Sequence, residues 1–425
     1  MKVLVVGSGG REHALVWKIS QSPLLTALHA APGSAAIAEL ATCHDVAVGD
    51  LEGLVELAKR ESIDLVVVGP ENPLCDGMAD RLRQAGIATF GPSKGAARLE
   101  ASKAFAKDFY ARHHVPSARY GTFSDAAEAK AFLDQFEPPY VLKADGLAAG
   151  KGVVILSDRA EAEAEIDAFL SGKFGEASKT LVIEEFMHGE EVSIFALCDG
   201  KDVLFCGAAQ DHKRVGEGDT GLNTGGMGAY SPAPIATPAL IETAMKTIIE
   251  PVAKGLAAEG HPFQGVLFAG LMVDKNGPRT VEFNIRFGDP ECQVLMFRIA
   301  DDILPYLRAT AEGTLGEMES LQWTPEPAIT VVMAANGYPG DYKKGTLIEG
   351  VDAANMMEGV QVFEAGTARD SQGRRTAAGG RVLNVTASGE SLHYAVDRAY
   401  AAVDQINWPD GFCRRDIAWR ALKTH

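Results

Sequence analysis

The sequence predicts a multidomain protein of the α/β and α+β classes that begins with a parallel α/β domain. Its 425 residues are a length typical of two to four domains. Short apolar runs at Lys2–Val6, Asp64–Val68 and Ile87–Phe90 alternate with helical patterns at Leu51–Arg60 and Met78–Gln84. Strands that alternate with helices in this way indicate a parallel sheet.

A middle region of mixed strands and helices is expected to follow. Strands are predicted at Tyr140–Lys143, Val153–Leu156, Leu181–Phe186, Glu190–Leu197 and Val203–Gln210, and helices at Ala160–Leu170 and Pro238–Ala258. The glycine-rich stretch from Val215 to Pro234 is predicted to be a long loop. Loops of this length are usually functional or disordered.

The remaining chain is expected to form a small mixed β/α domain. Two prolines within Leu321–Pro327 mark its boundary. Its predicted elements are strands at Ile329–Ala335, Val360–Glu364 and Gly379–Thr386 and an amphipathic helix at Ser391–Ile406. The expected domains are therefore 1–101, 102–325 and 326–425.

Composition excludes several classes of protein. The chain is 46% hydrophobic and 23% charged, which is typical of a globular protein, and it has no apolar run near the ~18 residues of a membrane helix. Its net charge of -17 argues against a nucleic-acid surface. The six scattered cysteines favour reduced thiols and a cytoplasmic location. We expect no membrane or nucleic-acid partner, and a monomer, with a dimer as the alternative.

A predicted β-hairpin carries the most informative residues. The apolar run Gly265–Val273 is followed by the turn signal Asp274–Gly277, so Thr280–Asn284 is predicted to be the return strand. Alternate residues of a strand share a face. Glu282 and Asn284 are therefore expected to present two oxygen ligands side by side.

The same strand predicts a metal site next to phosphate groups. Arg286 shares the face of Glu282 and Asn284 if the strand continues, whereas Phe283 and Ile285 face a core. Mg²⁺ takes few protein oxygens and shares its other positions with phosphates and water, which suits this face. The alternative is a polar strand face with a surface salt bridge.

A glycine turn follows the first predicted strand. Gly7–Glu12 only partly matches a dinucleotide fingerprint, because Glu12 stands where the third glycine belongs. The acidic residue expected about 20 positions later is also missing, since His29–Gly33 lies there. A phosphate held by backbone N–H groups near Arg11 and a purely structural tight turn both remain open.

Small residues and a lysine follow the predicted strand that ends at Lys143. Gly146, Gly150 and Gly152 would let the backbone close over phosphates, with Lys151 inside the loop. The segment is not a P-loop, because Gly152 follows Lys151 where that motif requires Ser or Thr. We expect a flexible lid, with a glycine-rich hairpin as the alternative.

Charged residues stand at the ends of several later strands. Glu184 and Glu185 end one strand and Glu191 begins the next, where carboxylates could accept hydrogen bonds from adenine and ribose. Asp211 and Lys213 belong to the charge run Gln210–Arg214, which suits a carboxylate or phosphate substrate. Solvated strand edges and a solvated charge run are the alternatives. No Ser-His-Asp or Cys-His nucleophile pattern stands out.

The order of these signals resembles the ATP-grasp enzymes. Within that superfamily the chain is similar to the glycinamide ribonucleotide synthetase (phosphoribosylamine–glycine ligase) family along essentially its whole length. The segments that carry the likeness are Gly7–Ala14, Gly69–Leu74, Ser102–Lys103, Lys143–Gly152, Ile183–Phe186, Gln210–Arg214, Asn223–Pro232, Glu282–Glu291 and Gly379–Val382.

The resemblance implies a reaction and an architecture. ATP would phosphorylate the carboxylate of glycine, and the amine of 5-phosphoribosylamine would attack the glycyl phosphate in an early step of purine (IMP) synthesis. ATP and Mg²⁺ or Mn²⁺ are the implied cofactors. The middle domain would be a two-lobed ATP-grasp domain whose mobile lid lobe spans about 120–190.

The resemblance also implies roles for single residues. Lys103 and Lys143 would hold ATP phosphates, Glu282 and Asn284 would hold the metal, and Arg286 would stabilise developing negative charge. The lid would exclude water, which otherwise hydrolyses an acyl phosphate. The other nucleotide-binding candidates are Gly146, Gly150, Lys151, Gly152, Glu184, Glu185 and Glu191. The substrate candidates are Asp211 and Lys213 for glycine and its phosphate, and Gly9, Gly10, Arg11, Glu71 and Asp289 for phosphoribosylamine.

Two departures from the family pattern affect these assignments. Many ATP-grasp enzymes carry another metal carboxylate on the preceding strand, where this chain has Gly270, with Asp274 in the turn instead. That leaves the number of metal ions open. Asn72 and Cys75-Asp76 also depart from the family's usual segment around Glu71.

Two rival functions are weighed against the ligase. A biotin-carboxylase-like enzyme of the same superfamily would use bicarbonate instead of glycine. A regulatory module would bind ATP without turning it over, but it would not need both lysines and both metal ligands.

Overall fold

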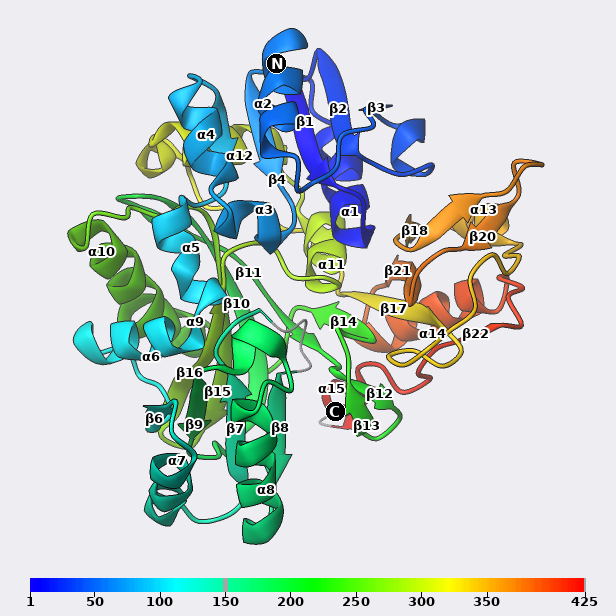
Figure 1. Cartoon of the computed structure of the whole chain (residues 1–425). Helices are drawn as coiled ribbons and strands as arrows, with labels where there is room; N and C mark the ends of the chain where they lie inside the picture. Colours follow the sequence, from blue (N-terminus) through cyan, green and yellow to red (C-terminus); the bar gives the residue numbers. More distant parts are fainter. Residues whose placement is uncertain (148–151, 424–425) are drawn as a thin grey trace.

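The computed structural model describes residues 1–147 and 152–423 of the chain (Figure 1). The strands near the N-terminus are β1 (Lys2–Gly7), β2 (Ala27–Pro32), β3 (Thr42–Cys43), β4 (Leu65–Val68) and β5 (Ala88–Phe90). They form a parallel sheet in the order β3-β2-β1-β4-β5, which confirms the predicted class of this region. Its helices are α1 (Gly10–Ile19), α2 (Leu51–Arg60), α3 (Glu71–Cys75) and α4 (Met78–Gln84).

Two helices lead from this sheet towards the middle of the molecule. They are α5 (Lys94–Ala101) and α6 (Lys103–Arg112). Ser102 separates them and begins α6 with an N-cap, because its hydroxyl accepts a hydrogen bond from Phe105 N at 3.1 Å. This cap places Lys103 at the first position of α6.

A four-stranded antiparallel sheet occupies the lower part of Figure 1. Its strands are β6 (Tyr120–Phe123), β7 (Tyr140–Ala144), β8 (Val153–Leu156) and β9 (Leu181–Glu184), in the order β6-β9-β7-β8. Helices α7 (Ala126–Phe132) and α8 (Arg159–Leu170) pack on it. The core between them includes Leu142, Phe169 and Ile183.

A nine-stranded sheet forms the largest layer of the molecule. Its strands are β10 (Glu190–Asp199), β11 (Val203–Asp211), β14 (Gly228–Ser231), β15 (Gln264–Asp274), β16 (Gly277–Asn284), β17 (Ala328–Ala335), β18 (Val360–Glu364), β21 (Arg381–Ser388) and β22 (Gly411–Phe412). The associated helices are α9 (Pro238–Ala244), a π-helical turn (Met245–Ile249), α10 (Glu250–Ala258), α11 (Glu291–Arg298) and α12 (Ile303–Glu312).

The glycine-rich stretch 215–234 is not the single loop that we predicted. It contains most of a small hairpin, β12 (Arg214–Gly216) with β13 (Thr220–Asn223), and the whole of β14. Strand β14 pairs with β11 on one side and with β17 on the other. Main-chain hydrogen bonds therefore continue from the middle of the chain across the boundary expected near residue 325.

The C-terminal part completes the sheet and covers it with helices (Figure 1). Its other elements are α13 (Val351–Asn355), β19 (Thr367–Arg369), β20 (Arg375–Ala377), α14 (Leu392–Val403) and α15 (Trp419–Lys423). Short 3₁₀ turns lie at Ile37–Glu39, Leu133–Gln135, Gly175–Ser178 and Leu315–Glu317. Among residues 1–147 and 152–423, no helix combines the length and apolarity that crossing a membrane requires.

Candidate active site

The end of β16 presents the two oxygen ligands that the sequence predicts on one face. Glu282 is exposed and Asn284 is largely buried, with its Oδ1 accepting a hydrogen bond from Arg286 Nη2 at 3.2 Å. Phe283 and Ile285 are only 2% and 1% exposed and belong to the hydrophobic core. The alternation of the strand thus separates a polar face from a packed face, as expected.

The pairing of β15 with β16 shows the surroundings of Gly270, which stands where many ATP-grasp enzymes carry another metal carboxylate. Gly270 lies directly opposite Glu282. Asp274 is in the turn, where its Oδ1 accepts from Asn276 N at 2.7 Å and its Oδ2 lies 3.9 Å from Arg279 Nη2. Over the described part of the chain, no three His, Cys, Asp or Glu side chains gather as a metal site. Glu282 and Asn284 suit a divalent ion that takes its other ligands from phosphates and water.

Arg286 connects this metal-ligand face to the N-terminal sheet. Its Nη2 lies 2.8 Å from Glu100 Oε1, and its Nε lies 3.2 Å from Glu71 Oε2. Glu100 Oε2 also accepts from Ile285 N at 2.8 Å. The guanidinium therefore fixes the loop after β16 against α3 and α5.

Glu100 was not predicted from the sequence. Burial raises the pKa of its carboxyl, and the nearby Arg286 partly offsets that rise. A signal did exist, because Glu100 stands in the last turn of α5, where the helix dipole disfavours an acid. A buried acid in the last turn of a helix needs a cationic partner from another element, which here is Arg286.

Two lysines share one carboxylate at the end of β9. Lys143 Nζ lies 3.1 Å from Glu184 Oε1, and Lys107 Nζ lies 3.5 Å from Glu184 Oε2. Strands β7 and β9 are neighbours, so Lys143 and Glu184 lie diagonally on one face. Lys107 was also missed, although Lys103 and Lys107 are four residues apart on α6 and so share a helix face.

The start of α6 is tied to the segment that follows β7. Lys103 Nζ donates to Gly146 O at 3.0 Å, and Asp145 Oδ1 accepts from Ser102 Oγ at 2.9 Å. Gly152 O accepts from Ala144 N at 2.8 Å. Of the predicted lid residues, Gly146 and Gly152 are therefore placed near Lys103 and Lys143. Gly150 and Lys151 lie outside the described residues.

The side chain of Glu185 lies in a different environment from that of Glu184, and its assignment to the nucleotide stays a prediction. It follows β9, and its carboxylate bonds Arg119 Nε at 3.2 Å and Arg279 Nη1 at 2.9 Å. Arg119 N adds a further hydrogen bond at 3.0 Å. Adjacent residues of an extended chain point to opposite sides, and here one side carries the two arginines.

Lys213 lies among the acidic residues at the centre of the site. Its Nζ is 2.5 Å from Glu191 Oε2, and it is also within electrostatic reach of Asp211 and Glu282. The pKa of Glu191 is lowered, first by the charge of Lys213. The structure therefore brings Glu191, Asp211 and Lys213 to the metal-ligand face of β16.

Glu291 is a buried carboxyl at the start of α11 that sequence reasoning did not assign. Burial and, to a lesser extent, the nearby carboxylate of Asp211 together raise its pKa to about 8, against the opposing effects of Lys213 and Arg286. An acid at a helix N-terminus is ordinarily stabilised as an anion. Here burial outweighs that preference.

We expect Glu291→Gln to remove a loss of stability that the wild-type protein undergoes as pH rises from about 4 to about 8. The folded-state pKa, about 8, exceeds the ordinary value near 4.3, so the folded protein holds an extra proton between these pH values. The contribution to the free energy of unfolding is therefore full below pH ~4 and is lost as pH rises towards about 8. Thermal unfolding from pH 5 to 9 measures this, with Glu358→Gln as an exposed control. The expectation would be contradicted if the thermal stability of wild type and that of Glu291→Gln depended equally on pH.

The glycine turn after β1 is filled by a side chain of the protein itself. Gly9 N donates to Glu12 Oε2 at 2.8 Å, and Arg11 Nε bonds Glu12 Oε1 at 2.7 Å. Gly10 is buried, and a Cβ there would lie 2.4 Å from Asn384 Nδ2. The carboxylate of Glu12 thus caps the glycine turn and Gly10 packs closely against Asn384, while the assignment of Gly9, Gly10 and Arg11 to a substrate stays a prediction.

Asp289 lies beside Gly9 and is linked to the C-terminal strands. A Cβ on Gly9 would be 3.7 Å from Asp289 Oδ2. Burial raises the pKa of Asp289, but Arg381 and Arg11 outweigh it and lower the pKa overall. Arg381 Nη1 donates to the carbonyl oxygens of Asp289 at 2.6 Å and Gly225 at 2.8 Å. Arg381 thereby joins the segment before α11 to the glycine-rich stretch before β14.

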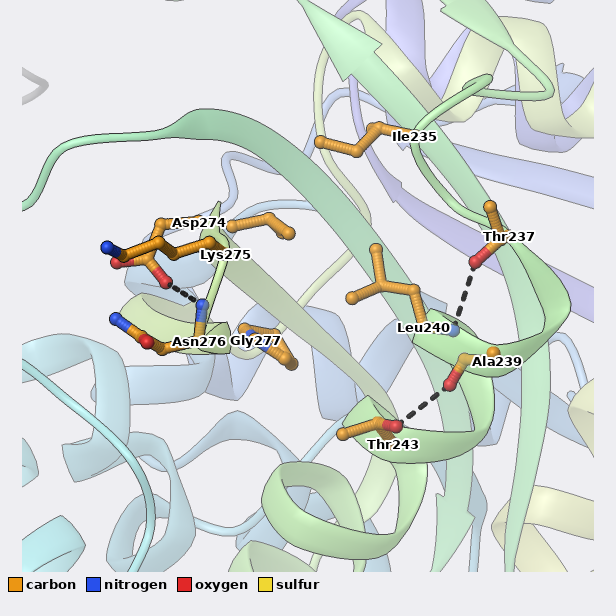
Figure 2. Close-up of a pocket in the computed structure, with 11 residues that line it drawn as sticks. Ile235, Thr237, Ala239, Leu240, Thr243, Asp274, Lys275, Asn276 and Gly277 are labelled. Carbon is orange, nitrogen blue, oxygen red and sulfur yellow. Dashed lines mark hydrogen bonds between the residues drawn. The ribbon is translucent and has the colours of Figure 1, made fainter.

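A separate surface groove of about 510 Å³ lies between α9 and the turn from β15 to β16 (Figure 2). Leu240 and Thr243 line one side, and Lys275 and Asn276 line the other. None of the described residues that we predict for the active site lines it. The groove is therefore distinct from the charged site around Arg286.

Models of known families match nearly the whole chain. The phosphoribosylglycinamide synthetase N domain matches residues 1–100, the ATP-grasp (A) domain of the same synthetase matches 101–292, and its C domain matches 328–420. A phosphoribosylamine–glycine ligase of Mesorhizobium japonicum is 57% identical over 422 residues, which cover 99% of each chain. That of Escherichia coli O157:H7 is 50% identical over 427 residues, covering 100% of this chain and 99% of the relative.

Solved structures agree with these matches. A phosphoribosylamine–glycine ligase from Thermotoga maritima superposes with a TM-score of 0.84 at 31% identity, covering 98% of this chain and 100% of that one. The biotin carboxylase domain of Hydrogenobacter thermophilus 2-oxoglutarate carboxylase superposes with a TM-score of 0.74 at 18% identity, covering 97% and 91%, and indicates a shared fold alone. The chain belongs to the phosphoribosylglycinamide synthetase (phosphoribosylamine–glycine ligase) family.

Proposed function

We propose that the chain ligates glycine to 5-phosphoribosylamine at the expense of ATP in purine biosynthesis. ATP phosphorylates the glycine carboxylate, and the amine of phosphoribosylamine displaces phosphate from the glycyl phosphate. The products are glycinamide ribonucleotide, ADP and phosphate. The single observation that carries this proposal is the likeness to phosphoribosylamine–glycine ligases along both whole chains.

The nucleotide is proposed to lie between β7, β9 and the end of β16. Lys103 and Lys143 would bind its phosphates, and Glu184 and Glu191 would bind adenine and ribose. The proximity of Lys143 to Glu184, at 3.1 Å, supports one site for both ends of the nucleotide. The segment with Gly146, Gly150, Lys151 and Gly152 would cover the phosphates and exclude water from the acyl phosphate.

The metal is proposed to be held by Glu282 and Asn284. Mg²⁺, or Mn²⁺ in its place, would neutralise the phosphate oxygens and polarise the transferred phosphoryl group when it is bound. The exposed carboxylate and the neighbouring amide oxygen support this assignment. We assign one protein carboxylate to the metal, because Gly270 faces Glu282 across the hairpin.

The two acceptor substrates are proposed to meet beside Arg286. Asp211 would bind the ammonium of glycine, while Lys213 and Arg286 would hold its carboxylate and the negative charge that develops there. Positioning and charge stabilisation then do most of the catalysis, because the nucleophile is the substrate amine. The side chains of Glu71 and Asp289 and the backbone of Gly9 would contact phosphoribosylamine, with Arg11 as a second layer behind Glu12.

The domain boundaries, the oligomeric state and the cellular compartment are also proposed. We propose domains at 1–101, 102–325 and 326–425, with a mobile lid lobe at about 120–190. The separate four-stranded sheet of residues 120–184 supports the lid lobe. We also propose that the protein is a monomer and that it acts in the cytoplasm, and the six unpaired cysteines support the proposed compartment.

Isotope transfer tests this reaction directly. Glycine labelled with ¹⁸O in its carboxylate is incubated with Mg-ATP and freshly generated phosphoribosylamine, and the released phosphate is analysed by mass spectrometry. We expect one labelled oxygen in each phosphate, because the carboxylate oxygen leaves with the phosphoryl group. Unlabelled phosphate, or release that requires bicarbonate in place of glycine, would contradict the proposal.

A further inference from the structure

Lys107 is a buried cation beside the proposed nucleotide site that the ligation reaction does not use. Its side chain is only 3% exposed and emerges from α6, which contacts both β9 and β16 (Figure 1). Its Nζ donates to Ser117 Oγ at 2.5 Å and lies 3.5 Å from Glu184 Oε2. A buried lysine costs several kcal/mol unless it is paired, so its position requires a reason.

The carboxylate of Glu184 has one lysine at each of its oxygens. Lys143 occupies Oε1 at 3.1 Å and Lys107 occupies Oε2 at 3.5 Å, and all three side chains are less than a tenth exposed. The two ammonium groups and one carboxylate leave an excess positive charge in the site. Lys107 is also held by a second partner, the hydroxyl of Ser117.

The ammonium of Lys143 has three N–H donors, and any donor that it gives to ATP phosphates weakens its 3.1 Å contact with Glu184. When Lys143 turns to the phosphates, Glu184 would be left as a buried carboxylate without a cation if Lys107 were absent. Removal of one partner from a buried ion pair is strongly destabilising, because the remaining charge is uncompensated. Lys107 provides the compensation from the opposite oxygen.

We propose that Lys107 is a positioning residue that keeps Glu184 paired and thereby releases Lys143 to bind the phosphates of ATP. The inference rests on the proposed function in one respect, namely that ATP binds between β7 and β9. Lys107 itself touches no substrate in this account. Its effect is exerted through Glu184.

A double-mutant cycle on Mg-ATP affinity tests this inference. Lys107→Met, Glu184→Gln and the double variant are compared with wild type by calorimetric titration with Mg-ATP alone. We expect Lys107→Met to weaken ATP binding about tenfold or more when Glu184 is present, because the two residues belong to one charge network. In the Glu184→Gln background we expect a change below about twofold, because no carboxylate then retains Lys143.

Controls separate this effect from a loss of folding. Lys254→Met removes an exposed i,i+4 partner of Glu250 on α10 and should leave ATP affinity unchanged. Ser117→Ala removes only the hydroxyl that holds Lys107, so it should weaken ATP binding in the same direction by less. It serves as the test if Lys107→Met does not fold.

A pH series gives a second readout. Burial lowers the pKa of Lys107 to about 8, against the opposing charge of Glu184. The other groups facing it are Lys143, Glu185, Tyr110 and Tyr120, and burial raises the pKa of both tyrosines, which stay neutral. ATP affinity of wild type should therefore fall as pH rises through about 8, and that of Lys107→Met should not follow.

The outcomes are distinguishable. Equal losses of ATP affinity from Lys107→Met in the Glu184 and Glu184→Gln backgrounds would overturn the inference and leave the proposed function standing. Unchanged affinity in Lys107→Met would do the same. Failure of the wild-type protein to bind Mg-ATP would instead overturn the proposed function, and the inference with it.

Discussion

Glu282→Gln is expected to lower kcat by about a hundredfold to a thousandfold while the fold stays intact. A bound metal contributes several kcal/mol of charge stabilisation, and each 1.36 kcal/mol is a factor of ten in rate. The substitution keeps the size of the side chain and removes its charge. Because Glu282 is exposed, the free energy of unfolding should change by less than about 0.5 kcal/mol.

The measurement is steady-state turnover over a range of Mg²⁺ concentrations, together with thermal unfolding. Glu319→Gln is the matched control, since it replaces an exposed glutamate far along the chain from β16. Full activity of Glu282→Gln at every Mg²⁺ concentration would remove Glu282 from the metal site. A variant that loses activity only by unfolding would leave the assignment without support.

Arg286→Met is expected to reduce both stability and activity, for separate reasons. Its guanidinium is the cation for Glu100, whose side chain is 9% exposed, and loss of one member of a buried pair costs about 3–5 kcal/mol. Its proposed role with developing charge predicts a further fall in kcat of about 10²–10³. Urea unfolding and turnover measure the two effects independently.

A second substitution separates these effects. In Arg286→Met with Glu100→Gln, the buried carboxylate has been neutralised, so most of the lost stability should return while activity stays low. The double variant thus distinguishes a structural ion pair from a catalytic charge. Recovery of near wild-type turnover in the double variant would show that Arg286 acts only on the fold.

Predictions from the sequence were most accurate where apolar and polar residues alternate with a regular spacing. Helices α2 and α4 begin and end at the predicted residues, because apolar spacing and flanking turn residues agree there. The alternation in β16 correctly separated Glu282 and Asn284 from Phe283 and Ile285. Each of these conclusions depends only on local geometry, which a single sequence contains.

Predictions failed where partners come from distant segments. Strand β14 was read as loop because its four residues carry no apolar run, and its strand conformation comes from pairing with β11 and β17. The side-chain partners of Glu185, Arg119 and Arg279, also come from distant segments and were not foreseen, and its assignment to the nucleotide stays a prediction.

The glycine turn and the unassigned charges illustrate the same limit. Glycine spacing at Gly9 and Gly10 left an anion site and a structural turn both open, and it did not reveal that Glu12 caps this turn. Glu100 and Lys107 were overlooked because each is an ordinary helical residue until its partner, Arg286 or Glu184, is brought beside it. In both cases the only signal in the sequence was a charge in an unfavourable local position, near a helix C-terminus for Glu100 and four residues from Lys103 for Lys107.

Phosphate release from Mg-ATP shows directly whether the protein joins glycine to phosphoribosylamine. It is measured with glycine and freshly generated phosphoribosylamine, together and singly, and with bicarbonate in place of glycine. We expect sustained release only when both substrates are present. Release that ignores both compounds but requires bicarbonate or another carboxylate would contradict the ligase assignment and leave only the ATP-grasp fold.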